Sequence, residues 1–213
     1  RGLVGSEMCI RDRAKSEHTG GEHFSAAMTT VDPSFDGMYG SFTITADDRR
    51  EVRNYRCCLL ASGLSLSIGL LQWWLLGSQW AWIWLVPLCI STGLALQWIH
   101  IYLRPLHRTL QLFWLLGCIG WLFLVLQASP GEALNTLADE PLWILAVGPL
   151  FAALTGIGFK EFFCFRRPEA VGLTLLLPMA LLGRLTGLVN NGMCLGLMLI
   201  AALLLSVLSM RTF

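Results

Sequence analysis

Long apolar runs separated by short polar connections fill most of the chain from residue 54 onward. Each run approaches the roughly 20 residues that an α-helix needs to cross about 30 Å of hydrocarbon. The pattern therefore predicts an all-α membrane domain over residues 54–213, built as a polytopic helix bundle. The six predicted spans are 57–77, 80–103, 109–127, 142–159, 170–188 and 192–210.

A polar segment, residues 14–53, precedes the membrane domain. Within it, SFTIT at 41–45 is a short candidate for extended structure. A short helix is predicted just before the membrane, because Thr45 has the side chain of an N-cap and Asp47 and Asp48 favour the positive end of a helix dipole.

The first residues of the chain, RGLVGSEMCIRDR at 1–13, resemble a translated sequencing adapter rather than a natural protein segment. They also lack the apolar core of a signal peptide. The residues that follow, up to Ala27, are polar and aperiodic. We therefore expect residues 1–13 to be a scar outside the fold, and we expect the natural start at Met28, with Met38 as the alternative.

Composition agrees with a membrane protein, since 55% of the residues are hydrophobic, 14% are charged and the mean hydropathy is +0.62. The net charge of +1 is too small to indicate a nucleic-acid partner. The seven cysteines show neither CxxC pairs nor zinc-type spacing, and we interpret them as small apolar core residues. Phosphate loops, HExxH and nucleophile elbows are also missing from the sequence, so we expect no bound cofactor and do not favour an enzyme.

Lysine and arginine are distributed unequally between alternate ends of the predicted spans. Positive side chains near span ends are retained on the cytoplasmic side, so the richer side is predicted to be cytoplasmic and to hold both termini. The poorer side has only Arg184. The richer side has ten such residues, namely Arg49, Arg50, Arg53, Arg56, Arg104, Arg108, Lys160, Arg166, Arg167 and Arg211.

Basic and aromatic residues gather in two stretches on the predicted cytoplasmic side, QWIHIYLRPLHR at 97–108 and KEFFCFRR at 160–167. The second stretch is predicted to be a loop at the membrane interface. Such side chains suit anionic lipid phosphates or an acidic partner protein, although they can also serve only to fix topology. The candidate partner- or lipid-binding residues are His100, Arg104, His107, Arg108, Lys160, Glu161, Phe162, Phe163, Phe165, Arg166 and Arg167.

Glu161 is interpreted as the partner of Lys160 in an ion pair that water screens, rather than as a general base. His100, His107, Glu161 and Cys164 have side chains that can bind metals. Because His100 ends one span and His107 lies beyond a proline, we expect no metal site.

Arg184 is the only charged residue inside a predicted span. It lies near enough to the end of its span to reach the interface. We expect it to pair with Glu132, Asp139 or Glu140 in the acidic loop at that side, and a contact with a substrate is the alternative.

Small residues four positions apart are predicted to face neighbouring helices, because helices in lipid gain stability mainly from close packing. Examples are Gly183 with Gly187 and Gly192 with Gly196.

Four stretches carry a family resemblance: FDGMYGSFTITADDRREV, WIHIYLRPLHRTLQLFWLLGCIGW, EPLWILAVGPLFAALTGIGFKEFFCFRRPEA and TLLLPMALLG. They resemble an uncharacterised multi-pass integral membrane protein family, a domain of unknown function common in cyanobacteria and plastids. The resemblance covers Phe35 to Phe213. It implies a plasma or thylakoid membrane, and it assigns neither an activity nor site residues.

The functional prediction is a non-enzymatic scaffold or assembly factor embedded in the lipid bilayer. Its predicted cytoplasmic face, formed by residues 35–56, 100–108 and 158–169, holds nearly all the polar side chains and would bind another membrane complex or anionic lipid. The alternatives are a small-solute transporter and a membrane enzyme or binder of haem, quinone or pigment.

Overall fold

The computed structural model of the chain describes residues 34–37, 40–43, 46–99, 104–165 and 167–211. The expectations for residues 1–13, for a start at Met28 or Met38 and for a helix cap at Thr45 fall outside these ranges.

A β-hairpin precedes the helices. Strand β1, Ser34–Gly37, pairs antiparallel with β2, Gly40–Thr43, in a register that places Phe35 opposite Phe42. The extended stretch predicted at 41–45 is thus a strand as far as Thr43, and its last two residues are outside the described ranges.

Within the described ranges, six helices are long and apolar enough to cross a membrane, which confirms the helical six-span prediction. The predicted helix before the membrane and the first span are one continuous helix. A short helix, α5, lies in the connection between α4 and α6. The helices are α2 (Ala46–Leu76), α3 (Leu85–Trp98, preceded by the 3₁₀ turn Ala81–Trp84), α4 (Arg104–Ala128), α5 (Ala133–Asp139), α6 (Ile144–Phe165), α7 (Pro168–Leu185) and α8 (Asn191–Met210).

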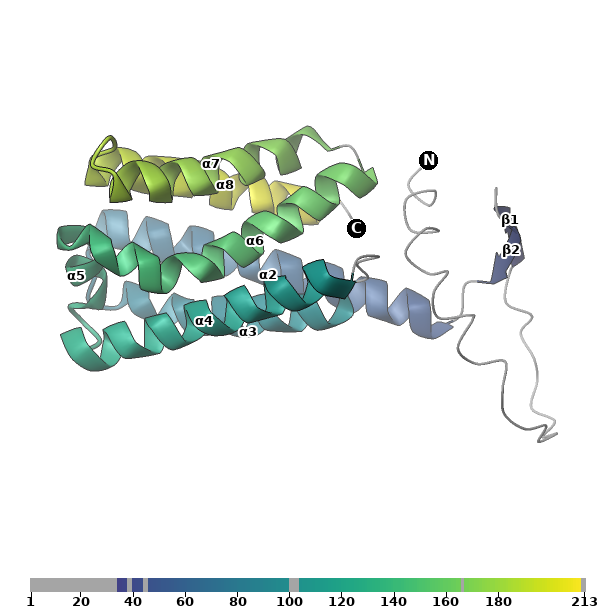
Figure 1. Cartoon of the computed structure of the whole chain (residues 1–213), viewed down its shortest axis with the longest axis horizontal. Helices are drawn as coiled ribbons and strands as arrows, with labels where there is room; N and C mark the ends of the chain where they lie inside the picture. The colour runs from purple at the N-terminus through teal and green to yellow at the C-terminus, as the bar shows by residue number, and fades with distance from the viewer. Residues whose placement is uncertain (1–33, 38–39, 44–45, 100–103, 166, 212–213) are drawn as a thin grey trace.

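The six long helices run side by side (Figure 1). Each packs on the next in the order α2, α3, α4, α6, α7 and α8, and α8 packs on α2, so the helices form a closed ring. Helices α2 and α6 are therefore on opposite sides of the ring. Every helix of the ring contributes a leucine that is almost fully buried, namely Leu59, Leu96, Leu124, Leu154, Leu177 and Leu205.

Glycines allow the closest approach in the ring, between α4 and α6. A Cβ atom added at Gly117 or Gly120 would overlap the backbone of Leu150 or Ala146. Hydroxyl groups tie other neighbours together, as where Ser62 of α2 lies 2.7 Å from Ser91 of α3. Close helix approach at glycines and hydrogen bonds between hydroxyl groups are both typical of helix packing in lipid.

The four predicted glycine contacts are wrong. Gly187 has φ +75° and follows the end of α7, where the Val189 N–H donates to the Gly183 carbonyl in a helix-ending turn. A Cβ added at Gly183 would meet only Val189, one at Gly192 only the side chain of Asn190, and one at Gly196 nothing within 4 Å, so none of these residues is at a contact with another helix.

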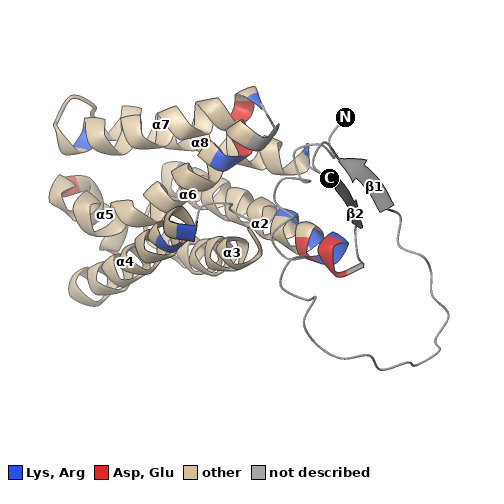
Figure 2. Ribbon diagram, turned by 45° about the vertical axis from the view of Figure 1, so that its right-hand side comes forward, with Lys and Arg blue, Asp and Glu red and all other residues tan. Residues whose placement is uncertain are grey.

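Charged residues lie mainly at the two ends of the ring, with uncharged residues between them (Figure 2). We call the end where α2 begins and α8 ends the terminal end, and the opposite end the α5 end. Arg104, Lys160 and Arg211 lie at the terminal end, whereas Arg184 lies at the α5 end.

Candidate functional site

The predicted interface loop at 160–167 is largely helical. Helix α6 continues to Phe165 and α7 begins at Pro168. The prediction of a loop was wrong because it was based on the density of charge, whereas a helix can sort charged and aromatic side chains onto different faces. Here Glu161 is buried while Phe159 and Phe163 are exposed.

Glu161 is at the centre of a buried polar cluster. The Tyr55 hydroxyl donates a 2.8 Å hydrogen bond to Glu161 Oε1, and Lys160 Nζ lies 3.2 Å from the same oxygen. Lys160 Nζ also lies 5.0 Å from the centre of the Tyr55 ring, a cation–π distance. The Lys160–Glu161 pair thus forms, but the expectation that water screens it is wrong, since Glu161 is 0% exposed.

This cluster crosses the interior of the ring. Tyr55 comes from α2 and Glu161 from α6, on opposite sides of it. A buried carboxylate is costly unless a cation or hydrogen-bond donors compensate it, so the pairing strongly favours one rotation of α6 about its axis. The Tyr55–Glu161–Lys160 cluster therefore fixes which residues of α6 face outward.

Three phenylalanines of α6 are exposed beside this cluster. The rings of Phe159 and Phe163 have centroids 4.5 Å apart, and those of Phe162 and Phe163 are 5.3 Å apart. Phe163 is 64% exposed and Phe162 is 37% exposed. The side chain of Phe165 lies outside the described part of the structure.

Basic residues occupy the same end of the neighbouring helix. Arg104 and Arg108, in the first turns of α4, are exposed, and His107 is half-buried. Arg167, half-buried, precedes α7. Because α4 packs on α6, both groups of side chains lie at the terminal end, and we call Arg104, Arg108, Phe159, Phe162 and Phe163 the aromatic-basic face.

Two further candidates, His100 and Arg166, are outside the described residues, as is the side chain of Cys164. The structure therefore places neither residue relative to the aromatic-basic face. Among the side chains that are described, no three of His, Cys, Asp or Glu gather as metal ligands.

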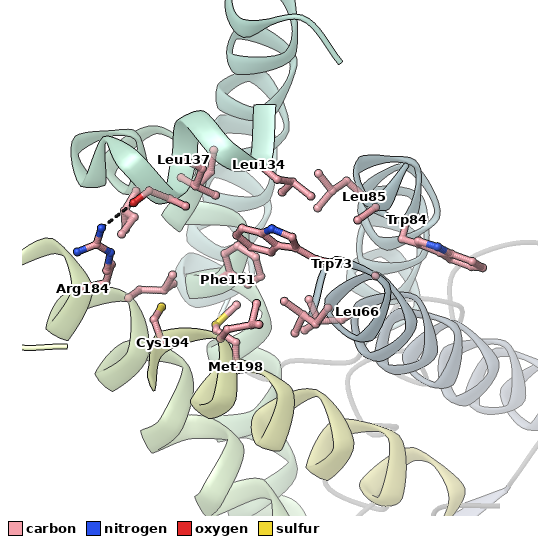
Figure 3. Close-up of a pocket in the computed structure, with 18 of the residues that line it drawn as sticks. Leu66, Trp73, Trp84, Leu85, Leu134, Leu137, Phe151, Arg184, Cys194 and Met198 are labelled. Carbon is pink, nitrogen blue, oxygen red and sulfur yellow. Dashed lines mark hydrogen bonds between the residues drawn. The ribbon is translucent and has the colours of Figure 1, made fainter. Parts of the chain in front are cut away.

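Arg184 has a different partner from the predicted carboxylates. Its Nη2 donates a 2.6 Å hydrogen bond to the carbonyl of Ala138, near the C-terminal end of α5 (Figure 3). The carboxylates of Glu132 and Glu140 instead accept hydrogen bonds from Asn135 and Trp143. Sequence analysis missed this contact because it did not predict α5.

A cavity of about 350 Å³ lies inside the ring toward the α5 end. Arg184 lies at one side of it and Leu66, Phe151 and Met198 line its apolar part, as Figure 3 shows. Sequence reasoning did not find this cavity, because its walls come from helices far apart in the chain.

Residues 94–213 match a family model described as an uncharacterized integral membrane protein (DUF2301). The match covers the last part of α3 and all later helices, which is more than half of the chain. Neither the curated proteins nor the solved structures contain a match.

Proposed function

The chain belongs to the DUF2301 family of uncharacterized integral membrane proteins, and we propose that it is a non-enzymatic scaffold or assembly factor for a membrane complex. The proposed partner is another membrane protein with an acidic surface at the level of the membrane interface. Docking takes place on the aromatic-basic face.

The exposure of Phe162 and Phe163 at the same end of the ring as the exposed Arg104 and Arg108 of the neighbouring helix is the observation that carries this proposal. Aromatic and arginine side chains are enriched at the centres of protein interfaces, where they supply most of the binding energy. Arginine also makes charge-assisted hydrogen bonds with carboxylates, which adds selectivity for an acidic partner.

The rotation of α6 supports the same proposal. The hydrogen bond from Tyr55 to Glu161 favours one rotation of α6, in which the phenylalanines are exposed without a partner. A preordered surface loses less conformational entropy on binding than a flexible loop.

We further propose that the aromatic-basic face is cytoplasmic, with both termini on that side. The ten-to-one distribution of Lys and Arg supports this orientation. The family resemblance supports a plasma or thylakoid membrane of a cyanobacterium or plastid. Residues 1–13 take no part in this function, in keeping with their adapter-like sequence.

The test compares two exposed phenylalanines. Phe163→Ala, on the aromatic-basic face, should release the chain from its native assembly. Phe123→Ala, on α4, is the control and should not, although Phe163 and Phe123 are similarly exposed, at 64% and 59%. The readout is the size of the assembly in native electrophoresis after mild solubilisation. Equal assembly in both variants would contradict the proposal.

A second pair of variants tests the charges. Arg104→Gln with Arg108→Gln should reduce assembly and its sensitivity to salt, while Glu132→Gln with Asp139→Asn at the other end should leave both unchanged. Lys160 stays unchanged because its loss would leave the buried Glu161 without its cation. A double arginine variant that keeps its assembly but loses solute uptake would favour the transporter alternative.

A further inference from the structure

The cavity at the α5 end has chemistry that the proposed scaffold role does not use. At the terminal end the Tyr55–Glu161 contact crosses the ring, whereas toward the α5 end the interior contains the cavity of about 350 Å³. This volume falls within the range of about 300–1,000 Å³ that is usual for small-ligand pockets. It is more than twice the volume of an apolar cavity of about 150 Å³ that stays dry and takes up apolar molecules.

We propose that this cavity binds one anionic amphiphile, with its acyl chain among the apolar side chains and a carboxylate or phosphate oxygen at Arg184. The inference is independent of the aromatic-basic face. It assigns a ligand to the one charged residue that lies inside a predicted span, and it places the ligand in the half of the ring away from Glu161.

The surroundings of Arg184 call for an anion. Its only hydrogen bond in the described structure is to the neutral carbonyl of Ala138, and its buried Nε has no partner. Among the described carboxylates, none lies within ion-pair distance of Arg184. A partly buried guanidinium is stabilised most by a charged acceptor, and an anionic ligand supplies one.

A second buried donor lines the same cavity. Trp121 Nε1 has no hydrogen-bond partner among the described residues, although Trp121 is buried and forms part of the cavity wall. A buried N–H without an acceptor is unfavourable. Trp121 lies seven positions before the last residue of α4, about 10 Å along the axis from the α5 end, so this second unsatisfied donor lies deeper in the cavity than Arg184.

The apolar part of the cavity extends from Arg184 toward the middle of the ring. Arg184 is the last residue but one of α7, at the α5 end. Phe151 and Met198 each lie seven positions beyond the first residue of their helices, which is about 10 Å along the axis at 1.5 Å per residue. Leu66 lines the same region from α2. An amphiphile can therefore place its head near the membrane surface and its chain inside the protein.

Binding is measured with brominated dodecanoate, brominated dodecyl phosphate and the neutral brominated methyl ester, because bromine quenches nearby tryptophans and Trp73, Trp84 and Trp121 line the cavity. Saturable quenching by either anion, with a dissociation constant at least tenfold lower than that of the ester, supports the proposal. Preference for the carboxylate assigns a fatty acid, and preference for the phosphate assigns a lipid head group. Equal binding of the ester, or no saturable quenching, overturns it.

Variants locate the site. Arg184→Gln should weaken binding of the preferred anion roughly 10- to 100-fold, as the loss of a charge-assisted hydrogen bond predicts, while Arg184→Lys should retain most of it. Arg211→Gln, which removes an exposed arginine at the terminal end, is the matched control and should bind as the unchanged protein does. Ser65→Leu fills part of the cavity from α2 and should weaken all three probes without removing charge. Unchanged affinity in both Arg184→Gln and Ser65→Leu overturns the proposal, whatever the stability of either variant.

Discussion

Tyr55 and Glu161 are 106 positions apart in the chain, yet the phenol of one donates a 2.8 Å hydrogen bond to the buried carboxylate of the other. They come from helices on opposite sides of the ring. Their contact is a long-range polar tie across the membrane domain, and it sets the direction in which the phenylalanines of α6 point.

Tyr55→Phe should destabilise the protein by about 1.5–3 kcal/mol, because it removes a hydrogen bond to a charged acceptor that has no access to water. The measurement is the midpoint of thermal unfolding in detergent. Trp84→Phe removes the 2.7 Å hydrogen bond to Gln72, a neutral and only partly buried pair, and should cost about 1 kcal/mol or less. Equal losses of stability in the two variants would mean that the charge of Glu161 does not strengthen its hydrogen bond with Tyr55.

Gly120→Ala should destabilise the ring by about 1–3 kcal/mol or more, since the added methyl group must push α4 away from the backbone of Ala146. Gly196→Ala is the control, because its methyl group enters open space and alanine is favoured over glycine in a helix by about 1 kcal/mol. The fraction of folded protein that survives heating gives both values. A Gly120 variant as stable as the control would show that α4 and α6 do not pack this closely.

The orientation can be tested with cysteines introduced one at a time into a background in which all seven native cysteines, the exposed Cys57 among them, are replaced by serine. An impermeant maleimide added outside should label Asn135→Cys, at an exposed position of α5, and should miss Arg104→Cys at the terminal end. Ten of eleven Lys and Arg residues assigned to the span ends favour this result. The reverse labelling pattern would place the aromatic-basic face outside and end the cytoplasmic proposal.

Arg184→Gln should loosen α5, because the hydrogen bond to the Ala138 carbonyl joins this seven-residue helix to α7. The rate of amide hydrogen exchange at residues 133–139 should rise about 10- to 100-fold, because the charge-assisted hydrogen bond no longer opposes local opening of this helix. Arg211→Gln should leave exchange in α5 unchanged. Without any difference between the two variants, the contact would have no part in holding α5.

The sequence predicted the six spans well because each span is a long apolar run, and length and hydropathy are local properties. The end of the fourth span was misplaced at Phe159, because Lys160 and Glu161 have the composition of a loop. Burying Glu161 in a continuing helix is favourable because the distant Tyr55 donates a hydrogen bond to it and its neighbour Lys160 pairs with it. A single sequence does not reveal which distant residue supplies that partner.

Contacts that depend on helix rotation were also beyond local reasoning. Gly120 approaches another backbone while Gly196 faces open space, although both are glycines in apolar helices. Arg184 was predicted to pair with an acidic side chain because a cation is expected to pair with an anion. Its observed partner is a backbone carbonyl near the end of α5. These outcomes are set by how the ring closes rather than by residue type.

Helix α2 gives the molecule a mechanical property. Its 31 residues make a rod of about 46 Å, which is longer than the roughly 30 Å of hydrocarbon. The rod carries Tyr55 near one end and Trp73, in the cavity wall, near the other. Because α2 is one continuous helix, a change in its tilt that widened the space around Trp73 would also move the phenol of Tyr55, and any coupling between the two sites would be equal in both directions.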